Sequence, residues 1–203
     1  LDDSIANSPT RAIVKKNFFY NPMTILWGAV SVLRIVKSIR KGENWWKDRF
    51  KIWKDYFPRF EKDLEKVVID LEKENERLYP GIREFLDYLY ENSPNQKRIL
   101  VTRTIKRIGK PYQQLLRFNQ GFYEQFEKYR IIESIIKEYQ PKMITIAGDS
   151  EEDKEMVDTA KRGNIKYCLG INVVKNIKKI NEEFDINIGR NWRGLQEIIN
   201  GEY

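Results

Sequence analysis

The second half of the chain alternates short apolar segments with helical patterns, and this alternation constrains the fold more than any other feature. Runs rich in β-branched and apolar residues occur at 98–102, 143–147, 165–169 and 184–188. Helices are predicted between and after them, at about 111–118, 122–139, 151–162 and 192–200. Strands that alternate with helices favour a parallel sheet, because each helix returns the chain to the start of the next strand. We therefore predict an α/β fold with a parallel sheet and helices on both faces.

The N-terminal part differs, because residues 9–78 contain no convincing strand. Its apolar spacing predicts three helices, at 22–40, 44–56 and 58–78. An amphipathic helix over 82–89 then leads into the first of the strands. An all-helical block thus interrupts an α/β core near its N-terminus, so residues 1–8 and 79–203 are predicted to form one domain and residues 9–78 another.

One stripe of aromatic residues lies within this helical block, and it has two interpretations. A helix-packing face and a lid that touches substrate both fit its spacing. The stripe consists of Trp45, Trp46, Phe50, Trp53 and Phe57.

The most apolar window of the chain runs from Met23 to Val36 and continues into Lys37 and Arg40. A membrane-spanning helix needs about 20 apolar residues. We therefore predict a buried or interfacial helix here, and we expect no membrane among the partners. Cys168 is the single cysteine, so no internal disulfide can form, and a cytoplasmic location is expected.

Histidine is absent from all 203 residues. Its absence excludes catalytic triads and dyads that use histidine, and every metal site with an imidazole ligand. The remaining chemistry belongs to carboxylates, lysines, hydroxyls and a hard cation that binds oxygen. The net charge of +7 favours anionic partners. Because no dense basic run is evident, we interpret the charge as a solvated surface and do not expect nucleic acid as a partner.

The segment 143–171 carries the clearest functional pattern. Its strand ends at Gly148, and Asp149 and Asp153 follow at the start of a helix. Ligands of open parallel sheets bind beyond the carboxyl ends of strands, where two such carboxylates can share a hard cation. The same residues also fit a helix cap, with an acid in the first turn where the helix dipole favours it. The local pattern leaves both interpretations open.

Several motifs together resemble the haloacid dehalogenase superfamily of phosphotransferases. The GDSEED segment with its following helix is similar to the last motif of that family. LYPGIREFLDYL followed by RILVTRT resembles the segment that ends in the second motif, at Thr102. Lys128 is the best match for the lone lysine of the third motif, ahead of Lys137 and Lys142. The helical block lies where this family often places a cap domain.

The opening LDDSI resembles the end of the first motif of the family, with Asp2 as its second aspartate and Ser4 in the position of its threonine. In this alignment the nucleophilic aspartate would immediately precede Leu1, outside the given sequence, together with the first strand.

The resemblance implies a Rossmann-like core, a helical cap and a Mg²⁺-dependent phosphatase that forms an aspartyl-phosphate. Asp2 would act as general acid and base. Asp149, Asp153 and the Asp2 backbone carbonyl would bind Mg²⁺. Thr102 and Lys128 would bind the phosphoryl group of a small phosphorylated substrate. The resemblance does not identify the substrate, and it does not decide whether aromatic residues of the cap form a homodimer.

Each assigned residue also has an ordinary structural interpretation. Thr102 fits an ordinary residue at the end of a strand, and Asp2 fits a turn residue. Lys128 fits a solvent-exposed lysine on a helix. The competing hypothesis for the whole chain is a non-catalytic binding protein of the same fold, with a nucleic acid or protein partner. Its affinity would fall steeply with salt and would not depend on Mg²⁺.

Overall fold

The protein has a mixed α/β fold in which the described strands pair in parallel. The computed structural model describes residues 29–30, 32–34, 36–37, 39–41, 78–173, 184–195 and 198. The chain divides into two compact units, one made of Leu1–Ser8 and Asn75–Tyr203 and the other of Pro9–Glu74. The assignment of these units as a catalytic core and a cap stays a prediction.

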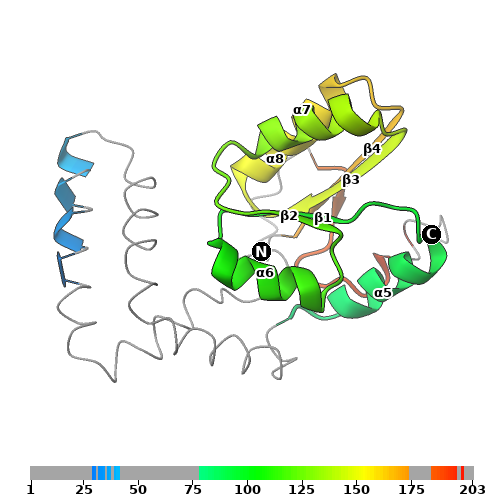
Figure 1. Ribbon diagram of the computed structural model, residues 1–203, viewed down its shortest axis with the longest axis horizontal. Coiled ribbons are helices and arrows are strands. Elements are labelled where there is room, and N and C mark those ends of the chain that lie inside the picture. The colour runs from blue at the N-terminus through cyan, green and yellow to red at the C-terminus, as the bar shows by residue number, and fades with distance from the viewer. Residues whose placement is uncertain are drawn as a thin grey trace. The chain divides into compact units, whose positions relative to one another are not determined.

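The described elements of the first unit alternate in the predicted way (Figure 1). In chain order they are α5 (Ile82–Asn92), β1 (Ile99–Val101), α6 (Lys106–Leu115), β2 (Gln120–Phe122), α7 (Lys128–Tyr139), β3 (Met143–Gly148), α8 (Glu151–Arg162), β4 (Tyr167–Asn172) and β5 (Ile186–Asn187). The strands form two small sheets, with the orders β1-β2 and β3-β4-β5. Helices α7 and α8 lie on one side of the strands, and α5 and α6 on the other.

Two apolar clusters hold these layers together. The first lies under α7 and α8 and is built from Ile132, Ile146, Met156, Val157 and Ala160. Val101 of β1 packs against this cluster, as do residues of β3 and β4, so the cluster joins the two sheets. The second includes Ile82 and Phe85 of α5, and the ring of Phe85 lies 5.6 Å from that of Trp192.

Two local predictions are wrong, and tertiary contacts explain both. The helix predicted from 122 begins at Lys128, because residues 120–122 form β2. The sequence of β2, QGF, has little strand propensity, so its pairing with β1 makes the strand. The helix predicted from 111 begins at Lys106 and contains Pro111. Burial of Ile108 and Tyr112 on one face outweighs the cost of about 3 kcal/mol for an interior proline.

The other predicted elements differ only at their ends, as far as the structure describes them. Helix α8 has the predicted bounds, and β4 begins two residues later than expected. Leu195 and Ile198 are helical within the predicted 192–200. The predicted helix 44–56 and residues 58–77 of the next lie outside the described residues, and Leu78 forms an isolated β-bridge.

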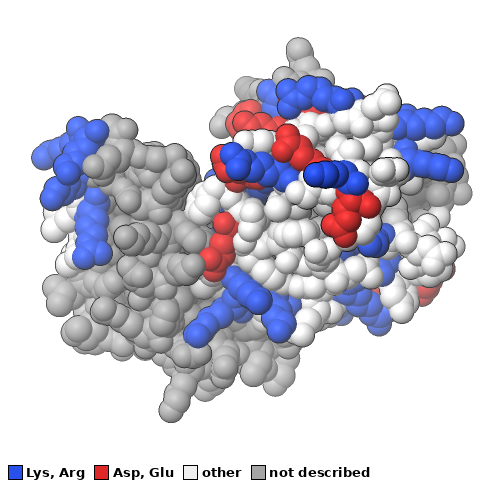
Figure 2. All heavy atoms as spheres, turned by 45° about the horizontal axis from the view of Figure 1, so that its top comes forward, with Lys and Arg blue, Asp and Glu red and all other residues white. Residues whose placement is uncertain are grey.

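In the N-terminal unit, the described residues from 29 to 40 are helical, as predicted for 22–40. Their side chains are exposed, and their Lys and Arg residues stand out together in Figure 2. We call this segment, residues 29–41, the basic helix. Within the described residues, no helix is long and apolar enough to cross a membrane.

Candidate active site

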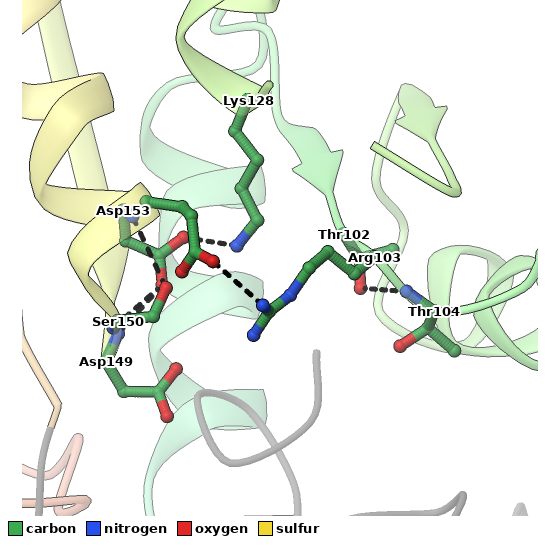
Figure 3. Close-up of polar contacts among 8 residues, drawn as sticks. Thr102, Arg103, Thr104, Lys128, Asp149, Ser150 and Asp153 are labelled. Atoms are coloured by element: carbon green, nitrogen blue, oxygen red, sulfur yellow. Dashed lines mark hydrogen bonds and ion pairs between the residues drawn. The ribbon is translucent and has the colours of Figure 1, made fainter. Parts of the chain in front are cut away.

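The candidate site lies where β1 and β3 end. Thr102 directly follows β1, and Asp149 directly follows β3. Asp153 lies in the first turn of α8, and Lys128 is the first residue of α7 (Figure 3). The four residues therefore come from the ends of two strands, which belong to different sheets, and from the starts of two helices.

Lys128 and Asp153 form a buried ion pair. The Lys128 Nζ lies 2.5 Å from Asp153 Oδ1, and the exposed fractions of the two side chains are 8% and 5%. A lysine in the first turn of a helix opposes the helix dipole, so α7 itself gains nothing from Lys128. Burying its charge is tolerable only because a carboxylate compensates it. Lys137 and Lys142, the two weaker matches for the lysine of the third motif, are both exposed.

The second oxygen of Asp153 binds the turn between β3 and α8. Asp153 Oδ2 accepts hydrogen bonds from the backbone N–H of Asp149 at 3.0 Å and of Ser150 at 3.2 Å, and from Ser150 Oγ at 2.8 Å. Ser150 Oγ accepts in turn from the Asp153 N–H, which completes a capping box. The helix-cap interpretation of this stretch is therefore confirmed for Ser150 and Asp153.

These contacts control the charge of Asp153. Burial by itself raises the pKa of the carboxyl group, because it removes water from the charged form. The charge and hydrogen bond of Lys128, together with the hydrogen bonds from Ser150 and the Asp149 N–H, outweigh burial and hold the pKa below its usual value. Asp153 is consequently an anion at neutral pH.

Gly148 is required next to this carboxylate. A Cβ atom at residue 148 would overlap the Cβ and Cγ atoms of Asp153. The absence of a side chain allows Asp153 to fold back over the end of β3 and reach both Lys128 and the turn.

Thr102 is buried, with an exposed fraction of 2%. Its Oγ1 accepts a hydrogen bond from the Thr104 N–H at 3.0 Å. The backbone holds Thr102 on both sides, because its N–H donates to the Phe122 carbonyl and its carbonyl accepts from the Gln125 N–H. Gln125 is only three residues before Lys128, so this contact brings the Thr102 and Lys128 segments together.

An ion pair that the sequence did not suggest joins the Thr102 segment to α8. Arg103 Nη1 lies 2.8 Å from Glu152 Oε1, and both side chains are about one third exposed. Figure 3 shows the Arg103 side chain extending from the Thr102 segment toward Lys128, Asp149 and Asp153. A cation after a strand and an acid in the first turn of a helix are each common, so nothing in the sequence indicated that they pair.

The remaining predicted residues differ in how far the structure describes them. Asp149 is partly buried, and in Figure 3 its carboxylate points away from Asp153. Asp2 lies outside the described residues. Among the residues that are described, no group of three or more Cys, Asp or Glu side chains is arranged to hold a metal ion.

No protein-family model matches this sequence, and no curated protein or solved structure matches it significantly. The function must therefore be argued from the geometry of the site.

Proposed function

We propose that the protein is a Mg²⁺-dependent phosphohydrolase of the haloacid dehalogenase type, which acts on a small phosphorylated metabolite through an aspartyl-phosphate. The observation that carries this proposal is the buried pair of Lys128 and Asp153, next to Asp149 and linked through Gln125 to Thr102. A buried cation held by one anion, at the end of parallel strands, is suited to receiving a second anion.

Lys128 would bind the phosphoryl group. An ammonium group has three donors. One of them is directed to Asp153, which leaves two for a phosphoryl oxygen and the attacking carboxylate. Asp153 acts in this proposal as a positioning residue, because it fixes the ammonium group at the head of α7 and offsets its burial.

Thr102 would donate a hydrogen bond to the same phosphoryl group. Its Oγ1 already accepts from the Thr104 N–H, and that contact leaves the hydroxyl proton to be donated. Because Thr102 is buried and held through its backbone, little rotational freedom is lost when substrate binds.

Asp153 is hindered as a ligand of Mg²⁺. Both oxygens of Asp153 are engaged by Lys128 and by the turn, so a cation would have to displace these donors. Mg²⁺ is usually bound by one or two carboxylates together with waters and substrate phosphate oxygens. We therefore assign the metal to Asp149, with the Asp2 carbonyl as the second expected protein ligand. When bound, the ion supplies positive charge that offsets repulsion between the phosphate and the carboxylates.

The remaining parts of the proposal follow the family pattern. Asp2 is assigned as the general acid and base that protonates the leaving oxygen and then activates water. The aspartate nucleophile is expected immediately before Leu1, two positions ahead of Asp2 and outside the given sequence. The α/β unit is proposed to be a Rossmann-like core, and the helical unit a cap that excludes water from the reaction.

The experiment is hydrolysis of 4-nitrophenyl phosphate by the full-length protein, with Mg²⁺ and with EDTA. Turnover is expected with Mg²⁺ alone, and Asp149→Asn should lower kcat/KM by about a hundredfold or more, because several kcal/mol of charge stabilisation are lost. Asp158→Asn changes another acid of the α8 segment and is the matched control, with activity near that of the unaltered protein. Turnover that is insensitive to EDTA, or full activity of Asp149→Asn, would contradict the proposal. Absence of turnover with salt-sensitive binding of RNA would support the binding-protein hypothesis instead.

A further inference from the structure

The excess of positive over negative charge lies in the N-terminal part of the chain. Residues 4–42 contain no Asp or Glu, and their seven cations are Arg11, Lys15, Lys16, Arg34, Lys37, Arg40 and Lys41. Without these seven, 30 of the 37 Lys and Arg residues remain, and the 30 Asp and Glu residues balance them. The net charge of +7 therefore equals the charge of this one segment. The excess positive charge is therefore local to this segment.

The basic helix, residues 29–41, also exposes large apolar side chains. The exposed fractions are 69% for Leu33, 59% for Val32, 55% for Ile39, 41% for Val30 and 39% for Val36. A helical face in water normally carries polar residues at such positions. Contiguous exposed apolar side chains on a helix indicate a surface that another apolar phase covers.

Apolar and basic side chains form two stripes on different sides of the basic helix. Val32, Val36 and Ile39 follow the i, i+4, i+7 spacing of one helix face. Arg34, Lys37 and Lys41 follow the i, i+3, i+7 spacing of a second stripe, which lies on roughly the opposite side of the helix. Figure 2 shows the blue side chains of this segment together, with no red side chain among its described residues. A helix with apolar residues on one face and Lys and Arg on the other is typical of segments that lie in a membrane interface.

We propose that the basic helix binds the surface of an anionic lipid bilayer. Its aliphatic side chains would enter the boundary between headgroups and acyl chains, while Arg34, Lys37 and Lys41 contact the lipid phosphates. The sequence predicted a buried or an interfacial helix for the apolar window from Met23 to Val36, and this proposal adopts the interfacial one. It does not depend on the proposed catalytic activity.

Charge and side-chain type favour lipid over other occupants. A second copy of the chain would place two helices of the same positive charge against each other, which is repulsive. Nucleic acid offers phosphates for the cations, but the bases stack on aromatic side chains rather than on Val, Leu and Ile. A bilayer that contains anionic lipid provides both negative charge and an apolar phase.

The experiment is co-sedimentation of the full chain with lipid vesicles. One set contains phosphatidylglycerol mixed with phosphatidylcholine, and the other contains phosphatidylcholine alone. Binding is expected to the first set, with a loss when salt is raised, because salt screens the attraction of exposed charges. Equal binding to both sets, or no binding to either, would overturn the proposal.

Two substitutions test the cations and the exposed apolar side chains of the basic helix separately. Lys37→Gln should lower the partition coefficient about fivefold, since each cation near an anionic surface contributes about 1 kcal/mol. Leu33→Ser should lower it about tenfold or more, through lost apolar burial. Lys110→Gln removes an exposed cation of α6 and is the matched control, with a change below about twofold.

Two further measurements separate the lipid proposal from its competitors. Thermal unfolding of Lys37→Gln and Leu33→Ser should match that of the unaltered chain, because both side chains are exposed. Light scattering should give the same mass for the unaltered chain and for Leu33→Ser. A dimer that Leu33→Ser dissociates would assign the surface to a second copy. Tighter binding to single-stranded RNA than to anionic vesicles would assign it to nucleic acid, and either result would overturn the proposal.

Discussion

At the scale of single residues, Lys128 has the most unusual environment among the described cations of the site. Its ammonium group is buried at the start of α7 and compensated by Asp153. The stability of α7 does not explain the lysine, because its charge opposes the helix dipole. Buried charge pairs of this kind are weak evidence for stability but a frequent feature of functional sites.

Lys128→Met is expected to destabilise the α/β unit by about 3–5 kcal/mol, because it leaves the Asp153 carboxylate buried without its cation. The measurement is the free energy of unfolding in urea, for Lys128→Met, Asp153→Asn and the double variant. The double variant should recover much of the loss, since both charges are removed together. Additive losses in the double variant would show that the two charges do not interact.

The ion pair of Arg103 and Glu152 differs from that of Lys128, although it lies at the same end of the strands. Its side chains are about one third exposed, so water screens the attraction and the pair adds little stability. The pair does bring the segment after β1 and the first turn of α8 together. Its contribution is therefore to the arrangement of the site.

At the scale of elements, the side chain of Asp185 adds to the backbone pairing that attaches β5 to β4. Asp185 precedes β5, and its Oδ2 accepts a hydrogen bond from the Gly170 N–H at 2.7 Å. Its Oδ1 lies 3.0 Å from Lys161 Nζ in α8. Partial burial raises the pKa of Asp185, but the bonds from Gly170 and Lys161 outweigh it, so the pKa in the folded protein is below the ordinary value.

This lowered pKa predicts how stability depends on pH. The contribution of Asp185 is fully present above its unfolded pKa, about 3.9, and is lost as the pH falls through the lower folded pKa. The midpoint of thermal unfolding should therefore be lower for Asp185→Asn than for the unaltered protein at neutral pH, and the difference should shrink below about pH 4. Lys161→Gln, which keeps the Gly170 contact, should show a smaller effect. A difference that is constant with pH would contradict this role.

Helix α6 shows how packing can override a local signal. Its sequence KRIGKPYQQL contains Pro111, which favours a helix start at that residue, yet the helix begins at Lys106. The earlier start places Ile108 and Tyr112 together on the buried face. Strand β2 is a second example, because backbone pairing with β1 forms a strand from residues with little preference for one.

At the scale of the whole molecule, contacts between distant parts of the chain close the α/β unit. The Trp192 ring is buried against Phe85 of α5, and the Trp192 backbone N–H donates to the Pro80 carbonyl at 2.8 Å. Gly81 has a positive φ of 84°, and a Cβ there would overlap the backbone of Trp192 and Arg193. The Trp192 segment is thereby held against the helix that precedes the first described strand.

Trp192→Ala should lower the free energy of unfolding by about 3–5 kcal/mol, because a large buried ring leaves a cavity beside Phe85. Trp192→Phe keeps most of the apolar volume and should cost clearly less. Urea unfolding of the two variants checks this prediction, and equal losses for both would show that the ring packing contributes little.

The sequence by itself determined those features that depend on neighbouring residues. The period of apolar residues located most strands and all of α8, and the order GDSEED placed Asp149 and Asp153 after a strand. The absence of histidine limited the side-chain chemistry of the site to carboxylates, lysines and hydroxyls. Short-range periodicity and capping are local physics, so the sequence expresses them directly.

Only the tertiary structure decided which of these residues form an ion pair. Lys128 and Asp153 are 25 positions apart, and no local pattern marks either as the partner of the other. Their pairing depends on how α7 and α8 pack over a common apolar cluster, which brings both helix starts to the end of β3. This packing engages one oxygen of Asp153, the local helix cap engages the other, and for that physical reason Asp153 is not assigned to the proposed metal.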